Sequence, residues 1–414
     1  MDTLTRRRFL LASGVTGAAA LAAGAAVIGP RELQHAADNT PLDEADNILV
    51  LVTLYGGNDG LNTVIPYADS AYQDARPDLA YDADDVIRLD DEVGLNPSLK
   101  GLGALWKDKR LAIVRGAGYP TPDFSHFRSM DIWQTASPSA PVTTGWIGRW
   151  LDATGDDPVR ALNIGSVLPP AGVGARCTAA ALDASGDGQL RPTFASAVTG
   201  LGRTQTGDSP ATSTVCTSYR NERTVAKTFA SALRGTSTTS GNGRGARSGG
   251  HSGQSANALS GQLDFVGRCV KAGVPTRAYL VSLGGFDTHA NEKQTQQQLL
   301  STFDDAVSGF LKDMAGDRNG KKVVVMAYSE FGRRVAANAS DGTDHGTAGP
   351  VFVAGVPVQG GYYGDPPSLT KLDDGNMIST VDFRAVYGEV VRGVLGADPS
   401  RVLDKVPSEL GFLA

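Results

Sequence analysis

Long apolar runs separated by polar loops rich in glycine dominate the pattern of this chain. Near-continuous apolar stretches lie at residues 47–55, 111–115, 278–283, 323–328 and 351–354, with a weaker one at 160–168. Such runs are typical of strands buried on both faces of a parallel sheet. Apolar positions at helical spacing predict helices at about 99–106, 126–134, 146–151, 258–270, 291–315 and 381–395. This alternation predicts an α/β fold with a mostly parallel, doubly wound sheet flanked by helices.

The first residues have a different pattern. Arg6 and Arg7 precede a weakly apolar segment, rich in alanine and glycine, that runs to about Ile28. Paired arginines before such a segment are typical of a twin-arginine (Tat) signal peptide, which we assign to residues 1–37 with its linker. We therefore expect the Tat translocase to carry the protein to the periplasm, the cell wall or the exterior. The alternative is a membrane anchor, but this composition makes a poor spanning helix, so no stable membrane span is expected in the mature form.

Residues 38–414 are long enough for a single α/β domain. The Ser/Gly/Thr-rich tract at about 235–256 has almost nothing to bury, and it predicts a flexible insertion. A net charge of −6 argues against nucleic acid as a partner. Cys177, Cys216 and Cys269 lie far apart, which argues against a cysteine-ligated zinc site. We expect a disulfide between Cys177 and Cys216, with Cys269 as a buried small hydrophobe.

Histidines and carboxylates are concentrated in the loops that follow the predicted strands. Each of His126, His289 and His345 lies within three residues of an aspartate. For any one of them, a satisfied core histidine is the usual explanation. Imidazole with carboxylate is the ligand set of catalytic zinc and manganese sites, so we expect one or two divalent ions, Zn, Mn or Mg. The candidate ligands are Asp59, Asp287, His289, Glu330, Asp344 and His345.

Three further residues are candidates for catalysis. Ser125 stands at the predicted N-cap of a helix, where free N–H groups favour an anion such as phosphate, and His126 follows it. An equally favoured alternative is that Ser125 only caps the helix and that His126 only forms hydrogen bonds within the loop. Arg333 is placed to clamp a bound oxyanion, unless it and Arg334 form a solvated pair. Likewise, Asp59 taken alone fits an Asn-Asp-Gly turn without any chemical role.

Five motifs carry a resemblance to a known family. They are Leu-Tyr-Gly-Gly-Asn-Asp-Gly-Leu-Asn (54–62), Phe-Ser-His-Phe-Arg-Ser-Met-Asp-Ile-Trp-Gln (124–134), Gly-Gly-Phe-Asp-Thr-His (284–289), Ser-Glu-Phe-Gly-Arg (329–333) and Asp-His-Gly-Thr (344–347). Together they span nearly the whole mature chain. In these motifs the sequence resembles the bacterial family named domain of unknown function 1501, whose members are usually exported by the Tat pathway. That family looks like a relative of the alkaline phosphatases and sulfatases, which implies an α/β sandwich with metals at the C-terminal edge of its sheet.

The resemblance implies roles for individual residues. Asp59 would match a metal-bridging aspartate, Asp287 and His289 would bind one metal, and Glu330 with His345 would serve neighbouring positions. Ser125 would stand in the place of the nucleophile. The sulfatase Cys/Ser-x-Pro-x-Arg maturation motif is missing, and the usual Asp-His pair after a core strand is here Glu330-Phe331.

Two functional hypotheses follow. The first is an exported, metal-dependent hydrolase that acts on a phosphate or sulfate ester, carried by a small molecule or a polymer. The second is a catalytically silent metal-binding or interaction protein on the same fold. A serine hydrolase of the lipase type is a distant third, because the chain has no Gly-x-Ser-x-Gly motif.

Overall fold

The computed structural model describes residues 46–413, apart from 156, 158, 166 and 183–251. The predicted signal peptide, Cys216 and most of the predicted insertion lie outside this range, and the proposed Cys177–Cys216 disulfide therefore stays a prediction. Helix α9 already begins at Ser252, inside the segment predicted as an insertion. No helix of the described part is long and apolar enough to cross a membrane.

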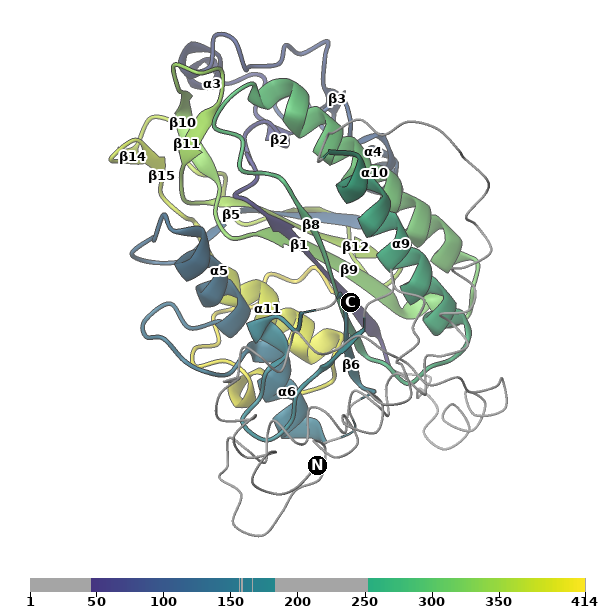
Figure 1. Ribbon diagram of the computed structural model, residues 1–414. Coiled ribbons are helices and arrows are strands. Elements are labelled where there is room, and N and C mark those ends of the chain that lie inside the picture. The colour runs from purple at the N-terminus through teal and green to yellow at the C-terminus, as the bar shows by residue number, and fades with distance from the viewer. Residues whose placement is uncertain (1–45, 156, 158, 166, 183–251, 414) are drawn as a thin grey trace.

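A nine-stranded sheet forms the centre of the fold (Figure 1). Its strands, in spatial order, are β13 (Gly361–Tyr363), β5 (Leu111–Gly118), β12 (Gly349–Gly355), β9 (Val323–Ser329), β1 (Ile48–Tyr55), β8 (Ala278–Gly284), β6 (Ala161–Ile164) and β7 (Ala180–Leu182), while β16 (Val381–Asp382) pairs with β5. All pairings in this sheet are parallel except those of β12, which runs antiparallel to β5 and β9. The predicted mostly parallel sheet is thus confirmed.

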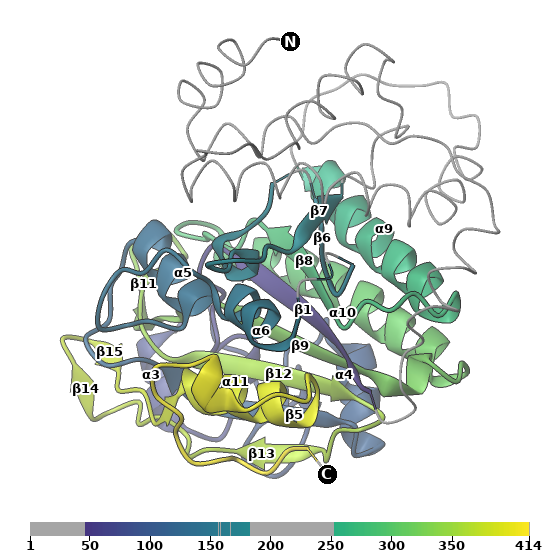
Figure 2. The same cartoon turned by 90° about the horizontal axis from the view of Figure 1, so that it is seen from below.

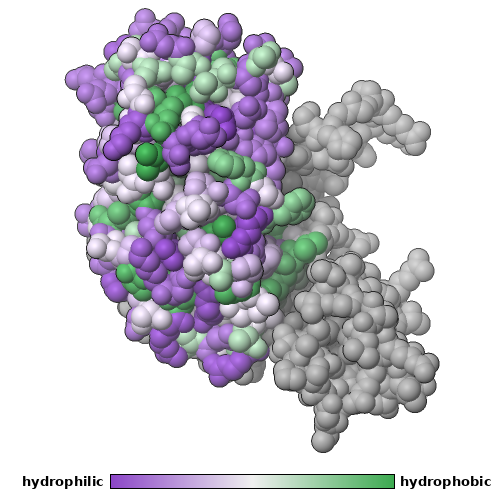
Figure 3. All heavy atoms as spheres, turned by 90° about the vertical axis from the view of Figure 1, so that its left-hand side faces the viewer, coloured by the Kyte–Doolittle hydropathy of each residue, from purple (hydrophilic) through white to green (hydrophobic). Residues whose placement is uncertain are grey.

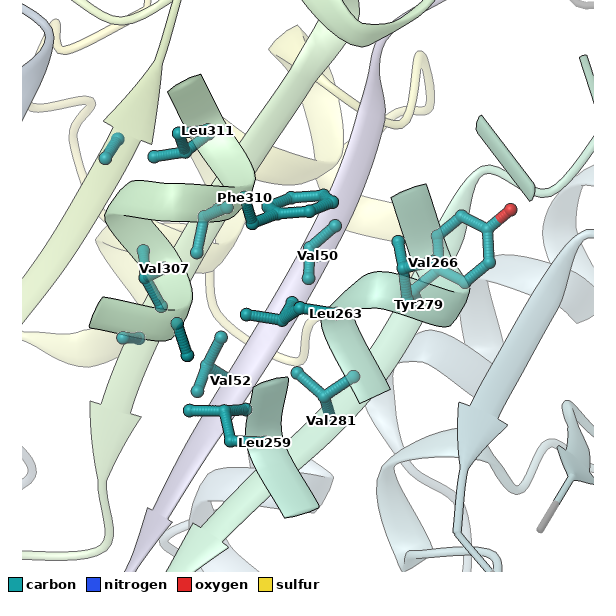
Figure 4. Packing of buried hydrophobic residues seen from close by; sticks show 14 of the residues in the cluster. Val50, Val52, Leu259, Leu263, Val266, Tyr279, Val281, Val307, Phe310 and Leu311 are labelled. Carbon is teal, nitrogen blue, oxygen red and sulfur yellow. The ribbon is translucent and has the colours of Figure 1, made fainter. Parts of the chain in front are cut away.

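Helices cover both faces of the sheet (Figures 1 and 2). One face carries α4 (Lys100–Lys107), α9 (Ser252–Lys271) and α10 (Glu292–Ala315), and the other carries α5 (His126–Thr135), α6 (Trp146–Thr154) and α11 (Phe383–Gly393). The first interface is shown in Figure 4, where side chains of α9 and α10 pack over Val50 and Val52 of β1. Cys269 is fully buried in that core, as predicted. Each strand has apolar side chains on both faces because both faces are covered.

Short elements complete the fold. They are α3 (Ser70–Ala75), the sheet of β2 (Val64–Ile65), β4 (Gly94–Leu95) and β3 (Ile87–Arg88), the hairpin of β10 (Arg333–Ala337) and β11 (Thr343–His345), the hairpin of β14 (Leu372–Asp373) and β15 (Asn376–Met377), and the 3-10 turns η2 (Pro170–Gly172), η3 (Gly320–Lys322) and η4 (Pro399–Arg401). The face that carries α5 and the β14–β15 hairpin mixes polar and apolar side chains (Figure 3).

Candidate metal centre

The loops that carry the predicted site residues meet at one edge of the sheet. β1, β8 and β9 are parallel neighbours, and they end at Tyr55, Gly284 and Ser329. Helix α5 begins at His126 and β11 ends at His345 beside these loops. The close approach of two loops depends on Gly56, whose φ is +120° and where a Cβ would lie 2.4 Å from the backbone nitrogen of Asp287. Only glycine fits there without displacing the loop that holds the aspartate.

Three imidazoles converge on the Asp287 carboxylate. From Oδ1 of Asp287, the Nε2 atoms of His289, His345 and His126 lie at 3.0, 3.2 and 3.4 Å. The Nε2 atoms of His289 and His345 are 2.9 Å apart. In a tetrahedral zinc site with bonds of about 2.0–2.1 Å, neighbouring ligand atoms are about 3.3 Å apart. The ligand atoms of His126, Asp287 and His345 all lie within 4.8 Å of one another, a spacing that could hold a metal ion, and His289 adjoins this group.

The other ring nitrogen of each imidazole faces an oxygen. Nδ1 of His126 lies 2.8 Å from Oε1 of Glu330, and Nδ1 of His345 lies 2.8 Å from the carbonyl oxygen of Phe124. Nδ1 of His289 lies 3.5 Å from Oδ1 of Asp344. A carbonyl or carboxylate oxygen accepts a hydrogen bond, so Nδ1 of His126 and Nδ1 of His345 are the nitrogens that carry a proton and donate it. Metal-binding histidines are oriented in this way, by an oxygen partner on the nitrogen that does not bind the metal.

This tautomer places unshared electron pairs against each other. In a neutral ring with its proton on Nδ1, Nε2 offers only a lone pair, and the Nε2 atoms of His126 and His345 face Oδ1 of Asp287. Such a cluster of acceptors repels itself unless a cation, either a metal ion or added protons, lies among them. Nε2 of His126 is buried and has no hydrogen-bond partner, and a metal ion would supply one. The residues present therefore fit a divalent metal.

Phe331 holds two of these rings in place. Its ring centroid lies 4.9 Å from that of His126 and 4.8 Å from that of His345, and its side chain is buried. Glu330 and Phe331, which follow β9 directly, both orient His126. From the sequence, Phe331 was expected only to stand where a histidine was missing, and its position directly after Glu330 was the available signal for this role.

Asp59 lies in a different environment from the one predicted. Its carboxylate forms a buried, two-pronged ion pair with Arg76, in which Nη2 of Arg76 lies 3.0 Å from Oδ1 of Asp59. The side chains of both residues are fully buried. Burial alone would raise the pKa of Asp59, but the charge and hydrogen bonds of Arg76 outweigh it and lower that pKa. With its charge already compensated, Asp59 is not one of the converging ligands, which corrects the assignment from sequence.

Arg333 is also placed differently. Its guanidinium is fully buried and donates to the carbonyl oxygens of Gly56, Gly57 and Phe286, and to Oδ1 of Asp287 at 2.9 Å. A side chain enclosed by backbone in this way cannot clamp a substrate. Burial would raise the pKa of Asp287, but the hydrogen bond and the charge of Arg333 outweigh it and lower that pKa. Arg333 therefore positions Asp287 and keeps it ionised.

Glu330 and Asp344 lie one step outside the imidazole cluster. Besides facing His126, Glu330 accepts hydrogen bonds from the Gly56 N–H at 2.9 Å and from the Ser329 hydroxyl at 3.0 Å, and it is buried. Asp344 is exposed and accepts from the side chain of Asn338. Both were predicted as ligands; in the structure Glu330 lies against Nδ1 of His126, and Asp344 lies beside Nδ1 of His289. His126, predicted to assist catalysis, points its Nε2 at Oδ1 of Asp287, and which of these groups bind a metal stays a prediction.

Ser125 is the N-cap residue of α5 by position, as predicted. Its hydroxyl makes no capping hydrogen bond, while its N–H donates to Oδ1 of Asp123 at 2.8 Å. The side chain is exposed beside His126. The hydroxyl is thus accessible from solvent at the helix N-terminus.

Sequence comparison agrees with the resemblance noted above. Residues 242–388 match the sequence model of the family described as "Protein of unknown function (DUF1501)". This stretch includes Asp287, His289 and His345. The expected relationship to that family is confirmed there, and no curated protein matches the chain.

Among solved structures, two similar proteins share very little sequence with this chain. The crystal structure of Ps i-CgsB has 9% identity and a TM-score of 0.37, covering 87% of this chain and 75% of its own. That of the lipoteichoic acid synthase LtaP from Listeria monocytogenes has 9% identity and a TM-score of 0.36, covering 91% of this chain and 80% of its own. Similarity at this level assigns no activity.

Proposed function

We propose that this protein is an exported, metal-dependent hydrolase of a phosphate or sulfate ester. The observation that carries the proposal is the imidazole–carboxylate cluster, in which the Nε2 atoms of His126, His289 and His345 lie 3.0–3.4 Å from Oδ1 of Asp287. Each ring also has an oxygen at its Nδ1. Simple packing does not require the Nε2 atoms of three imidazole rings to point at one carboxylate oxygen.

One divalent ion suits the cluster better than two. Asp59 forms an ion pair with Arg76, and Glu330 contacts His126. These two carboxylates therefore do not complete a second set of ligands. Among the described residues, one group of side chains, that of His126, Asp287 and His345, converges closely enough to hold a metal, and His289 adjoins it. Three imidazoles favour zinc over magnesium and manganese, which prefer oxygen ligands. A bound ion would supply Lewis acidity to a phosphoryl or sulfuryl oxygen.

Groups of the protein itself would bind the anion, attack the ester and hold the metal-binding side chains in place. The first N–H groups of α5 are available to hydrogen-bond an anionic oxygen, and they are favourably placed for negative charge at a helix N-terminus. Ser125, accessible at that same terminus, would attack the ester or orient the attacking water. Glu330 keeps the His126 ring in its orientation, and Arg333 keeps the Asp287 carboxylate in place.

The metal proposal is tested by the metal content of purified, folded protein. We expect wild-type protein at neutral pH to retain close to one divalent ion per chain by mass spectrometry. Asp287→Ala and His289→Ala should lose it, while the exposed Asp91→Ala, a matched removal of a carboxylate, should keep it. Wild-type protein that is empty after purification, and stays empty after incubation with zinc or manganese, contradicts the proposal.

A silent metal-binding or interaction protein is the second candidate. It is favoured by the burial of Arg333, which leaves that guanidinium unable to bind a substrate anion. Turnover of a panel of aryl phosphates and aryl sulfates separates the two candidates. A hydrolase should release the phenol, and Ser125→Ala should reduce the rate without removing the metal. A silent protein would show no turnover that Ser125→Ala changes.

Export by the Tat translocase remains part of the proposal. It is supported by the paired arginines and the alanine-rich segment that follows them. Fractionation of cells that express the full chain is the test, with Arg6→Lys combined with Arg7→Lys as the matched variant. Equal amounts of both proteins outside the cytoplasm would contradict Tat export.

A further inference from the structure

A cavity of about 610 Å³ lies beside the imidazole–carboxylate cluster. His126 and Glu330 form part of its wall, so the cavity is continuous with the candidate metal centre. The rest of the wall comes from α5, from the segment that joins β6 to η2, and from β1 and β8 of the sheet. Pockets of about 300–1,000 Å³ are typical of sites for small molecules. The cavity has room for the part of a substrate that extends away from its reacting group.

Among the described residues, the cavity wall contains no lysine or arginine. Its carboxylates are those of Glu330 and of Asp131, which is ion-paired with Arg128, and its apolar members include Leu51, Met130 and Leu168. A second anionic group placed here would meet carboxylates and hydrocarbon. The electrostatics therefore favour a neutral occupant.

The polar side chains of the wall already have partners within the protein. Tyr55 accepts a hydrogen bond from Gln134 at 3.0 Å, and the amide of Asn163 donates to the carbonyl oxygens of Gly165 and Val167. Thr53 donates to the hydroxyl of Tyr328. A polar wall whose groups are satisfied internally offers few hydrogen bonds to a ligand. It acts largely as an apolar surface.

Two strongly exposed apolar side chains belong to the same cavity. Phe127 is 91% exposed and Val167 is 61% exposed, the two largest values among the bulky apolar residues of the described part of the chain. Phe127 lies in the first turn of α5, directly after His126, and Val167 lies in the segment opposite. Exposed apolar side chains gathered at one place are typical of a binding surface.

We infer that this cavity binds the uncharged, largely apolar alcohol or phenol portion of the ester substrate, such as an aryl or alkyl group. The inference rests on the proposed ester hydrolysis, because it takes the anionic phosphate or sulfate to lie at the imidazole cluster. The substrate is then an amphiphile, anionic at the metal and apolar in the cavity. A sugar-like or doubly anionic substrate does not match the wall.

The first experiment measures binding without turnover. 2-Naphthol, an uncharged apolar probe, is titrated into purified wild-type protein, Val167→Asp and Val356→Asp, and binding is followed by calorimetry. Val356 is a matched control, because it is a similarly exposed valine at the opposite end of the sheet, after β12. We expect about tenfold weaker binding in Val167→Asp and no change in Val356→Asp. Equal binding by all three proteins, or no binding by wild-type protein, overturns the inference.

The second experiment uses esters that differ only in the phenol. For phenyl, 2-naphthyl and 4-carboxyphenyl phosphates, and for the corresponding sulfates, we expect kcat/KM to rise about tenfold or more from phenyl to naphthyl and to fall for the carboxylate. A carboxyphenyl ester preferred over naphthyl overturns the inference. If no ester turns over but naphthol binding still responds to Val167→Asp, the apolar site stands and only the proposed hydrolysis fails.

Discussion

The buried carboxyl group of Glu292 lies at the start of α10, next to the ion pair of Asp59 and Arg76. It is fully buried, and Thr343 donates a hydrogen bond to it. Burial is the main cause, and the negative charge of Asp59 the second, of a rise in the pKa of Glu292 from 4.5 to about 9. Folded protein at neutral pH thus carries Glu292 protonated, and the three groups together are neutral. We expect Glu292→Gln, which mimics the protonated acid, to stabilise the protein.

The size of the effect follows from the pKa. A carboxyl group with a raised pKa in the folded state contributes its full stability below pH 4.5, and that contribution is lost as pH rises toward 9. At pH 7, about 2.5 units above the unfolded value, the loss at about 1.4 kcal/mol per unit is about 3.5 kcal/mol. Glutamine does not ionise, so the free energy of unfolding of Glu292→Gln should be about 3.5 kcal/mol higher than that of wild type at pH 7. At pH 5 the advantage should be below about 1 kcal/mol.

Urea denaturation of both proteins at pH 5, 7 and 8.5 measures this difference. The gap between the two free energies of unfolding should widen with pH, while the dependence on urea concentration stays the same. The exposed Glu92→Gln is the matched control and should track wild type at each pH. A gap that is constant across pH, or a Glu292→Gln protein that is less stable at pH 8.5, would refute a protonated Glu292.

Three further substitutions probe the site and its support. Glu330→Gln should weaken metal affinity about 10- to 100-fold, measured by competition with a chromophoric chelator, because the His126 ring loses its anionic partner; unchanged affinity would remove Glu330 from the outer shell. Arg76→Met should destabilise the protein by about 3–5 kcal/mol in urea denaturation, because Asp59 is left buried and unpaired; a neutral result would mean that Asp59 is compensated elsewhere. Gly56→Ala should cost about 2–4 kcal/mol and reduce metal retention, because the new Cβ meets the backbone of Asp287; full metal content and stability would contradict that close approach.

The ends of the strands explain why the sequence located the site so well. The apolar runs at 47–55, 278–283 and 323–328 became β1, β8 and β9, which are parallel neighbours. Because parallel strands end at a common edge, loops that are remote in sequence meet there. The convergence of Asp287, His289 and His345 followed from this rule. It required only the strand pattern and the positions of the histidines.

The role of each side chain depended on partners that periodicity does not reveal. Asp59 follows its strand as predicted, but Arg76, 17 residues later, occupies its carboxylate. Arg333 follows Glu330 by three residues, yet its guanidinium turns into the carbonyls of the loop after β1. Burial and hydrogen-bond geometry choose between a ligand and a support, and these arise only when the elements pack.

By itself, the sequence determined the fold class, the edge of the sheet where the candidate site residues gather and most of the residues found there. These features follow from local pattern, because strand and helix periods are written in consecutive side chains. The tertiary structure alone decided which groups lie together. It placed Nε2 of His126 against Asp287, Glu330 beside His126, Asp344 beside His289, and Asp59 against Arg76. These roles depend on contacts of a few ångströms between residues that are far apart in sequence. The pattern of consecutive side chains does not encode such contacts.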